Sequence, residues 1–401
     1  MAVKTIFMVV ESLFPEDPRV FRESEYLKQN YRIFILALGE KSKKVLERSG
    51  RITVFRIPNM SGVGSVLQKI PLIGKFHYMI SYLYITLVAV MTFIATWPLY
   101  RYRYIHVHNP PDTFFVLGGL GKLLGTKFVY DVHDLSPELY VSRYPGRFGF
   151  IYKTLNIFEG WSCKLADTII TTNVSYKNTL VDRHHLDREK IYIVRNDPDL
   201  DEYVKYDFSD IQKDQHRWVL LFIGAINPQD GLDILLEVVH LLVRDHGRED
   251  LILLIVGDGD ALPDSKIRAQ ELGVEDYIEF KGFVRERREI QRCLHLADVC
   301  VEPAPSNPVN DLSTFVKIME YMAARKPIVA FDLPESRFSA DDSAILIQPG
   351  DIAAFALSVV KLLEDRELRV SLGERGYNRI HETLNWRNAT RTLGEAYSSM
   401  N

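Results

Sequence analysis

Short apolar runs alternate with longer stretches of helical length along the first half of the chain. β-Branched and aromatic residues gather in five short runs, at residues 5–10, 32–38, 104–108, 128–131 and 167–171. Amphipathic or apolar segments long enough for helices separate most of these runs. Strands that alternate with helices form βαβ units and a parallel sheet. We therefore predict a doubly wound, Rossmann-like α/β domain over residues 1–196.

A polar segment interrupts this pattern before a second alternating series begins. Residues 197–216 are rich in aspartate and contain a proline, which is typical of a linker. Further strands are predicted at 218–223, 251–256, 277–280, 299–301, 328–330 and 344–347, with helices near 232–245, 286–296, 314–324 and 352–364. A second doubly wound domain is thus expected over residues 217–384. A cleft between two such domains is the expected ligand site.

Composition narrows the class of protein. The 401 residues are 47% apolar and 25% charged, close to the average for soluble globular proteins. This excludes a disordered chain, a collagen and a membrane protein of many helices. Three scattered cysteines are too few for a disulfide framework or a zinc site, which favours a reducing compartment. The first residues lack the basic region and cleavage site of a signal peptide, so a cytoplasmic location is expected.

The charge is distributed unevenly along the sequence. Residues 1–200 contain 26 Lys and Arg against 18 Asp and Glu, a net charge of +8, whereas the remaining residues carry −12. A basic first half and an acidic second half suggest that the two halves meet different partners. The basic residues are not dense enough to indicate a nucleic-acid partner.

The segment of residues 303–337 contains the richest candidate chemistry. Asn310, Asp311 and Ser313 precede a predicted helix and are residue types that cap helix N-termini. Free N–H groups at such a helix start bind anions, and Lys317 would add a full positive charge. Glu320 follows on the same helix face, where its carboxylate suits two ribose hydroxyls. The pattern fits a nucleoside diphosphate, with a capped helix bearing a surface Lys–Glu pair as the alternative.

Motifs spread over most of the chain resemble those of one enzyme family. They read EDPRVFRESEYL, HVHNPPD, YDVHDLSPELY, IVRNDPDL, FIGAINPQDG, IVGDGD and STFVKIMEYMAARKPIVAFDLPESR, with LNWRNATRTLGEAY near the C-terminus. In these motifs the chain resembles the retaining glycosyltransferases of family four (glycosyl transferases group 1), and among them the subgroup of polysaccharide and O-antigen assembly. The resemblance implies the GT-B fold, in which two Rossmann-like domains face a central cleft. It also implies that residues 385–401 pack back on the first domain.

The resemblance further implies a reaction and the residues that carry it. A sugar would pass from a nucleotide-sugar donor, expected to be UDP-linked, to a hydroxyl of a lipid-linked saccharide, with retention and without a metal or other cofactor. Catalytic roles would fall to His133, Lys317 and Glu320. Donor contacts are expected from Arg195, Gly224, Gly257, Asp258, Gly259, Phe283, Val284, Asp311, Ser313, Thr314 and Phe315, and acceptor contacts from Glu11, Arg19, Asn109 and Asp112.

Three positions depart from the family pattern. The family usually has two glutamates eight positions apart; Glu320 matches the second, but Leu312 occupies the place of the first. Ala225 and Asp230 stand where many relatives have an arginine and a lysine that touch donor phosphate. Lys317 is the first candidate to replace that charge. These losses leave two alternatives open: a non-catalytic GT-B subunit that binds a nucleotide or a partner, and a nucleotide-sugar hydrolase or epimerase.

Two Asp-x-Asp pairs, at residues 197–199 and 258–260, match the metal signature of a different glycosyltransferase fold. Two carboxylates at that spacing suit a hard divalent cation that bridges phosphates. The same pattern arises often by chance, and the first pair lies in the acidic linker. We therefore assign no metal to either pair.

Residues 76–100 form a run without Asp, Glu, Lys or Arg. A helix of this length permits three interpretations: it spans a bilayer, lies buried in the core, or presses an apolar face into a membrane surface. Spanning would separate the first predicted strands from the rest of their own sheet. Because Lys69, Lys75, Arg101 and Arg103 flank the run and suit anionic headgroups, we favour peripheral attachment to the inner face of the membrane through the basic first half.

Overall fold

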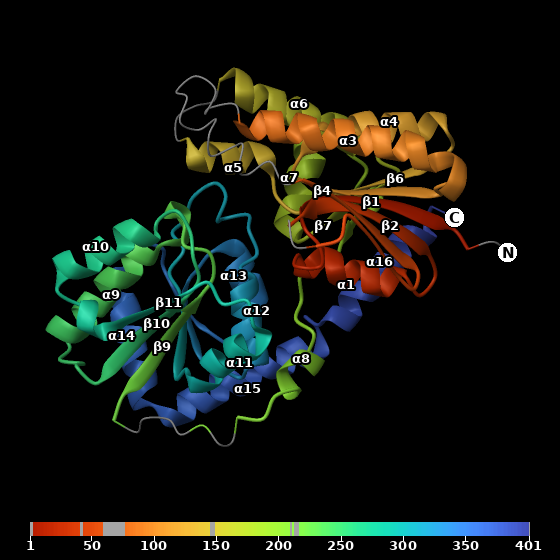
Figure 1. The fold of residues 1–401 in the computed structure, drawn as a ribbon. Coiled ribbons are helices and arrows are strands. Elements are labelled where there is room, and N and C mark those ends of the chain that lie inside the picture. Colours follow the sequence, from red (N-terminus) through yellow and green to blue (C-terminus); the bar gives the residue numbers. More distant parts are fainter. Residues whose placement is uncertain are drawn as a thin grey trace. The chain divides into compact units, whose positions relative to one another are not determined.

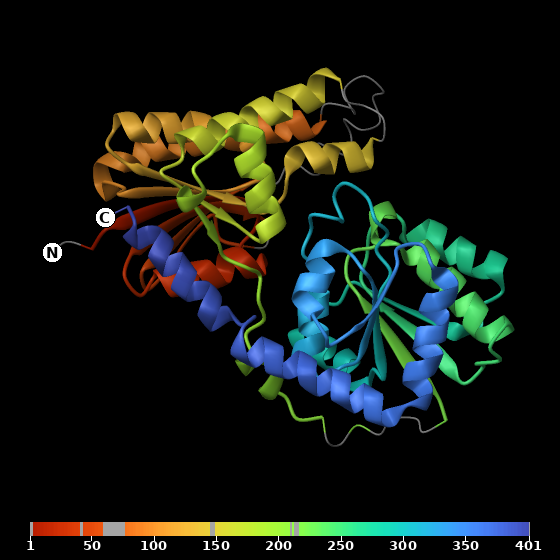
Figure 2. The ribbon, with the colours of Figure 1, turned by 180° about the vertical axis from the view of Figure 1, so that it is seen from behind.

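A computed structural model describes residues 3–40, 43–58, 77–144, 149–208, 211 and 216–400 of the chain. The chain divides into two compact units, one made of Met1–Arg195 together with Thr390–Asn401 and the other of Asn196–Ala389. Figures 1 and 2 show the units from opposite sides. Lys69, Lys75 and Phe76, which belong to the predicted membrane-binding segment, lie outside the described residues.

The first unit is built on a mainly parallel sheet. Among the described residues it has eight strands in the order β3-β4-β2-β1-β5-β6-β7-β8, and only β3 runs antiparallel to its neighbour. The strands are β1 (Thr5–Leu13), β2 (Arg32–Gly39), β3 (Leu46–Ser49), β4 (Ile52–Pro58), β5 (Tyr104–His108), β6 (Lys127–Val132), β7 (Thr168–Thr171) and β8 (Ile191–Ile193). The central strand β5 is buried along its whole length, as expected when helices cover both faces of a parallel sheet.

Helices cover both faces of this sheet. The described ones are α1 (Pro18–Leu27), α3 (His77–Tyr100), α4 (Phe115–Leu123), α5 (Ser136–Arg143), α6 (Phe150–Leu165) and α7 (Val174–His184). Figure 1 shows α3, α4 and α6 side by side on one face, whereas α1 lies on the other with the final helix, α16 (Trp386–Ser398). The ring of Tyr397 on α16 packs against Tyr104 and Tyr31, with ring centroids 5.1 and 5.4 Å apart. The end of the described chain is therefore part of the first unit's core.

The second unit is a parallel sheet between helices. Its six described strands lie in the order β11-β10-β9-β12-β13-β14, and every recorded pair is parallel. The strands are β9 (Trp218–Ile223), β10 (Leu251–Val256), β11 (Ile278–Gly282), β12 (Val299–Glu302), β13 (Ile328–Phe331) and β14 (Ile345–Ile347). The helices are α8 (Asp201–Val204), α9 (Leu232–Arg244), α10 (Leu262–Leu272), α11 (Arg287–Leu296), α12 (Val316–Ala323), α13 (Pro334–Ala340), α14 (Ile352–Glu364) and α15 (Arg366–Glu382). The predicted fold class, two doubly wound α/β units, is confirmed.

The predicted linker belongs in part to the second unit. Residues 201–204 form the short helix α8, and the amide of Trp386 donates a hydrogen bond of 3.1 Å to the carbonyl of Pro198. Asp197, which belongs to the predicted acidic linker, is only 3% exposed. Residues 201–208 are exposed or half-buried, whereas the first residues of the segment are held in place by the second unit.

Candidate active site

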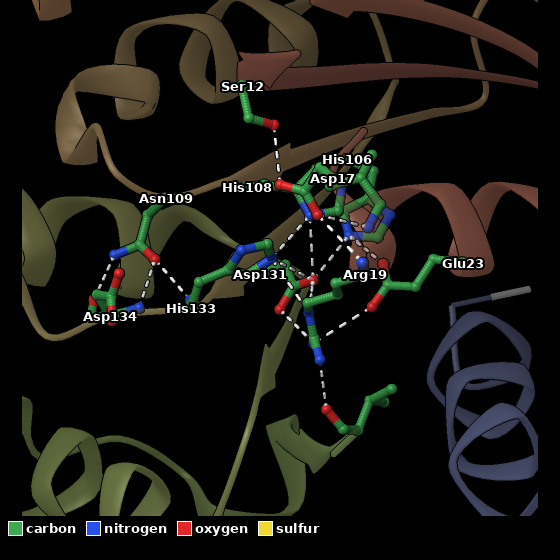
Figure 3. Close-up of polar contacts among 12 residues, drawn as sticks. Ser12, Asp17, Arg19, Glu23, His106, His108, Asn109, Asp131, His133 and Asp134 are labelled. Atoms are coloured by element: carbon green, nitrogen blue, oxygen red, sulfur yellow. Dashed lines mark hydrogen bonds and ion pairs between the residues drawn. The ribbon is translucent and has the colours of Figure 1, made fainter. Parts of the chain in front are cut away.

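Six polar side chains meet inside the first unit, around the carboxyl ends of β5 and β6. We call Arg19, Glu23, His106, His108, Asp131 and His133 the histidine–carboxylate cluster; Figure 3 shows it. His108 is the register partner of Asp131 across the two strands, and His106 lies two residues earlier on the same strand face. Arg19 and Glu23 lie one turn apart on α1, which packs on that face.

Asp131 is the centre of the cluster. Its Oδ2 lies 3.1 Å from Nδ1 of His108, 3.2 Å from Nε2 of His133 and 3.2 Å from Nε of Arg19. Its Oδ1 accepts a second hydrogen bond of 2.8 Å from the Arg19 guanidinium. Burial alone would raise the pKa of Asp131, but Arg19 and the neighbouring histidines hold it well below its usual range. The carboxylate is therefore ionised and collects several donors.

Three further groups of the cluster, Glu23, His106 and His108, are held neutral. Burial raises the pKa of Glu23 well above its usual value, and repulsion from Asp131 raises it further. Burial lowers the pKa of His106 and brings that of His108 to about 3. The only formal charges that remain among these buried groups are those of Arg19 and Asp131, which pair with each other.

Arg19 has a different role from the one predicted. Its side chain is 4% exposed, binds Asp131 and Glu23, and donates a hydrogen bond of 2.7 Å to the carbonyl of Val194. It was expected to contact the acceptor. In the structure its guanidinium instead forms a buried ion pair with Asp131 inside the first unit.

The residue types of the cluster also suit a metal ion. Ligand atoms of Glu23, His106, His108 and Asp131 lie within 4.8 Å of one another, which is the one such group of His, Cys, Asp and Glu in the described part of the chain. The Arg19 guanidinium, however, lies against two of the four and already supplies the positive charge. The donor set therefore does not fit a metal ion while Arg19 is in place.

Asn109 and Asp112, the predicted acceptor contacts, are buried and bonded within the first unit. Asn109 accepts hydrogen bonds from the amides of His133 and Asp134 at 2.6 and 3.3 Å, and donates one of 2.9 Å to Asp112. Asp112 also accepts a hydrogen bond from the hydroxyl of Tyr130. Burial, with repulsion from Glu159, raises the pKa of Asp112 to about 6. These two residues fix the loop that carries His133.

Glu11, the fourth predicted acceptor contact, lies near the end of β1 and is half-buried. Burial raises the pKa of its carboxyl to about 7, although a hydrogen bond from Ser81 opposes the shift. Its role at an acceptor stays a prediction.

In the second unit, Lys317 lies beside the ends of β9 and β12. Its Nζ is 2.7 Å from Oε2 of Glu302 and 4.3 Å from the centre of the Phe222 ring. A Cβ on Gly224 would lie 2.9 Å from Cε of Lys317, so glycine at this position leaves room for the lysine. Glu302 is buried, and burial raises its pKa although Lys317 opposes the shift. Sequence analysis missed Glu302, since nothing local marks a strand-end glutamate as the partner of a lysine fifteen positions later.

Glu320 lies on α12 with its carboxylate 2.8 Å from the guanidinium of Arg287. Arg287 also contacts Glu202 and donates a hydrogen bond of 3.1 Å to the hydroxyl of Tyr203. The predicted ribose-binding carboxylate is thus already half of an ion pair. Arg287 was not predicted, because it is 33 positions from Glu320 in the sequence.

The start of α12 contradicts the predicted capping. The N-cap residue is Phe315, and no side chain caps the helix. The side chain of Asn310 binds the carbonyls of Gln229 and Pro305, Ser313 binds the carbonyl of Val309, and Asp311 accepts from Ser306. These side chains stabilise their own loop. The first N–H groups of α12 therefore have no side-chain cap, which keeps them suitable for an anion.

In the second unit, glycines in the loops that follow β9 and β10 allow the backbones of the two loops to come close together. The amide of Gly224 donates to the carbonyl of Val256 at 3.0 Å, and Ile226 donates to the carbonyl of Asp258 at the same distance. A Cβ on Gly257 would lie 1.8 Å from the carbonyl oxygen of Gly224. Gly257 and Gly259 thus let the two loops approach each other, and their contact with a donor stays a prediction.

The remaining predicted donor contacts lie in varied surroundings. Phe283 follows β11 and is 70% exposed, whereas Val284 packs partly against the core of the second unit. Arg195 is 6% exposed. The hydroxyl of Thr314 lies 3.5 Å from a carboxylate oxygen of Glu335. Their roles at a nucleotide sugar stay predictions.

Known proteins resemble the chain in sequence and in fold. The family described as Glycosyltransferase Family 4 matches residues 19–202, and the one described as Glycosyl transferases group 1 matches residues 217–365. A D-inositol 3-phosphate glycosyltransferase of Corynebacterium kroppenstedtii is 24% identical over 58% of this chain and 53% of its own. The UDP-Gal:alpha-D-GlcNAc-diphosphoundecaprenol alpha-1,3-galactosyltransferase of Escherichia coli is 21% identical over 67% of this chain and 68% of its own. The match thus spans about half the length of the first of these relatives.

Two solved structures show the same fold over nearly the whole chain. Sucrose-phosphate synthase of Thermosynechococcus elongatus has a TM-score of 0.75 and 18% identity, with 99% of both chains covered. Anabaena HepE in complex with UDP has a TM-score of 0.70 and 14% identity, with 99% of this chain and 100% of the other covered. The likeness confirms the predicted GT-B fold.

Proposed function

Because the chain belongs to the family 4 (group 1) glycosyltransferases, whose two family matches cover residues 19–202 and 217–365, we propose a specific transfer reaction for it. A sugar passes from a UDP-linked donor, with retention of configuration, to a hydroxyl of a lipid-linked saccharide during surface polysaccharide assembly. The chain's likeness to an enzyme named for a diphosphoundecaprenol-linked acceptor supports the acceptor class.

The assignment of the donor site rests on the position of Lys317. Its ammonium lies beside Gly224 and close to the start of α12, where no side chain caps the backbone N–H groups. A diphosphate at this place meets one full charge and the positive end of a helix dipole. Because Ala225 and Asp230 cannot supply the charges usual at their positions, Lys317 and the helix start take over the stabilisation of the leaving group.

The protein's contribution to catalysis is positioning and charge stabilisation. In a retaining transfer without a metal, the acceptor hydroxyl attacks the sugar on the face from which the diphosphate leaves, and a diphosphate oxygen takes its proton. Charge on the departing diphosphate grows in the transition state, so Lys317 acts there more than in the ground state. Glu320 releases Arg287 and instead accepts hydrogen bonds from the hydroxyls of the ribose. His133 orients the sugar.

A lipid-linked acceptor requires access to a membrane, and α3 suits that purpose. Its segment Ile80–Tyr100 is long and apolar enough to cross a membrane, with a mean hydropathy of 1.7. Of the 18-residue apolar stretch within it, 22% is buried in the protein. Ile85, Ala89 and Phe93 are buried, and the Phe93 ring meets Phe7 of β1 at 5.5 Å. This packing against a central strand supports attachment along the membrane surface rather than spanning.

The exposed side of the helix layer formed by α3, α4 and α6 is apolar. We call it the apolar helix face; its exposed side chains are Ile80, Leu83, Leu87, Met91 and Ile94 on α3, Val116 and Leu123 on α4, and Phe150, Ile157 and Trp161 on α6. An exposed patch of this kind marks an interaction site. Arg101, directly after α3, and Lys153 on α6 are exposed and suit anionic lipid headgroups. We propose that this face holds the enzyme on the cytoplasmic side of the membrane.

A transfer assay tests the proposal as a whole. The full chain is incubated with each of a panel of UDP-sugars and a polyprenyl-diphosphate-linked saccharide, and the linkage of the product is read by NMR. The expected product keeps the anomeric configuration of the donor. An inverted product, or no product with any UDP-sugar, contradicts the proposal. Release of free sugar without transfer indicates a hydrolase, and nucleotide binding without turnover indicates a non-catalytic subunit.

A further inference from the structure

The Arg287 guanidinium has a different partner at each of its nitrogens. Its Nη1 donates a hydrogen bond of 2.8 Å to Oε1 of Glu320 on α12, and its Nη2 donates one of 3.1 Å to the hydroxyl of Tyr203 on α8. Its Nε lies 3.0 Å from Oε2 of Glu202, which is also on α8. The guanidinium carbon lies 5.5 Å from the centre of the Tyr203 ring. One positive charge at the start of α11 is thus shared by two carboxylates.

The two partners on α8 are anchored independently of Glu320. The side chains of Leu200 and Tyr203 pack against a buried hydrophobic cluster of the second unit. Because this packing does not involve the Glu320 carboxylate, Glu202 and Tyr203 remain beside Arg287 when Glu320 turns to another ligand. Arg287 then keeps a counter-ion, a hydrogen bond and an aromatic face. Its release from Glu320 therefore costs one ion pair.

The contact with Arg287 takes up the carboxylate that a ribose needs. Two vicinal ribose hydroxyls donate to the two oxygens of one carboxylate, and Oε1 of Glu320 already accepts from Arg287. The side chains of Arg287 and Glu320 are 35% and 18% exposed. Solvent screens a pair of this kind in part, so its exchange for a ligand is moderate in cost.

We propose that Arg287 is a built-in competitor for the ribose of the donor: it occupies Glu320 in the free protein and stays on Glu202 and Tyr203 when a ribose binds. The part played by the ribose rests on the proposed function. A diphosphate without a ribose offers Glu320 no hydroxyl pair and leaves the contact intact. Arg287 therefore weakens binding of every ribose ligand, including the product UDP, without touching it. Because the ion pair forms again as UDP leaves, it favours release of the nucleotide after transfer.

Calorimetry of the full chain with UDP and with inorganic pyrophosphate tests the competition without any need for transfer. Relative to pyrophosphate, Arg287→Met should bind UDP about three- to tenfold more tightly than the wild type does, as expected when a half-buried ion pair no longer has to be broken. The ratio of the two affinities cancels the effect of the lost charge on the diphosphate. Arg292→Met is the matched control, because it removes an exposed ion pair with Glu289 from the same helix and should leave the ratio unchanged.

Glu202→Gln should change the same ratio in the opposite direction. The released Arg287 relies on the Glu202 carboxylate, so without it the pair with Glu320 is harder to break. UDP should then bind about two- to fivefold more weakly relative to pyrophosphate. Glu271→Gln, from an exposed ion pair with Arg268, should have no effect. A role confined to the stability of the fold would not produce shifts of opposite sign in the two variants.

Opposite shifts in Arg287→Met and Glu202→Gln support the proposal. An unchanged ratio in Arg287→Met overturns it, and so does weaker UDP binding, which indicates that Arg287 contacts the donor. If Arg287→Met fails to fold, Glu202→Gln decides, and an unchanged or raised ratio there overturns the proposal. UDP that binds all variants alike refutes the competition while the proposed function stands. UDP that binds neither the wild type nor any variant refutes the proposed function and the competition with it.

Discussion

Substitution of Glu302 by glutamine would leave the Lys317 ammonium without its buried partner. The amide keeps the shape of the side chain and can still accept the hydrogen bond of 3.1 Å from the amide of Ala304. What is lost is the charge opposite Nζ of Lys317 at 2.7 Å. Breaking a buried ion pair at one partner costs about 3–5 kcal/mol. Lys317 is 11% exposed and rests on the Phe222 ring, so we expect about 2–3 kcal/mol.

The reciprocal substitution, Lys317→Met, should cost less. A buried carboxylate that loses its partner escapes by taking a proton, which at pH 7 costs at most about 3.7 kcal/mol from the ordinary pKa of glutamate. A lone ammonium escapes by losing a proton, at up to about 4.6 kcal/mol from the ordinary pKa of lysine. Burial already raises the pKa of Glu302, so protonation is easier still. We expect Lys317→Met to lower the free energy of unfolding by about 1–2 kcal/mol. The double variant should lose less stability than the sum of the two single losses.

Urea unfolding of both single variants and the double variant measures these costs and the coupling between the residues. The exposed pair of Arg325 and Glu374 is the matched control, and Glu374→Gln should cost less than about 1 kcal/mol. UDP should raise the melting temperature of Glu302→Gln more than that of the wild type, because a diphosphate replaces the lost negative charge. Unchanged stability in Glu302→Gln, or an equal response to UDP, would refute the reasoning.

Four further predictions follow from the site and the surface. Glu320→Ala should weaken binding of the UDP-sugar by roughly 1.5–3 kcal/mol in calorimetry, the range for a hydrogen bond to a charged group; equal affinity would remove it from the donor site. Transfer activity should survive EDTA, and loss that manganese restores would favour one of the Asp-x-Asp pairs. Leu87→Glu with Trp161→Ala should reduce co-sedimentation with anionic phosphatidylglycerol vesicles, whereas Leu357→Glu, on the second unit, should not; resistance to alkaline carbonate extraction would indicate a spanning helix instead. The free energy of unfolding should fall as the pH drops from about 6.5 toward 3, because the unfolded chain protonates its histidines near 6.5 while the pKa of His108 is about 3 in the folded state; His108→Gln should flatten that slope in urea titrations, and an unchanged slope would exclude His108 as its source.

Most strands could be predicted from the sequence, including the edge strands β11 and β14, but β3, β4 and β8 were missed. β9 and β10 begin and end where predicted, because both are continuous apolar runs bounded by polar residues. β3 was missed, since all four of its residues are exposed and it pairs only with β4 at the edge of the sheet. The local pattern of β3 carries no sign of burial.

Family motifs singled out Lys317, Glu320 and His133 as candidate site residues, and their roles stay predictions. The groups that contact them could not be predicted, because they lie far away in sequence: Arg287 is 33 positions from Glu320, and Arg19 is 112 positions from Asp131. Such ion pairs form because folding buries both charges together, which no local pattern shows. The predicted cap of α12 failed for a related reason, since the loop that precedes the helix uses the same polar side chains.

The part that residues 390–401 play in the first unit has a consequence for how the chain folds during synthesis. These residues leave the ribosome after the whole of the second unit, so the second unit has its complete sequence first. Until they emerge, the nascent first unit lacks Tyr397, whose hydroxyl lies 2.9 Å from Nδ1 of His106 and whose ring fills the space beside Tyr31 and Tyr104. The histidine–carboxylate cluster is therefore completed only after the second unit has been translated, by helix α16.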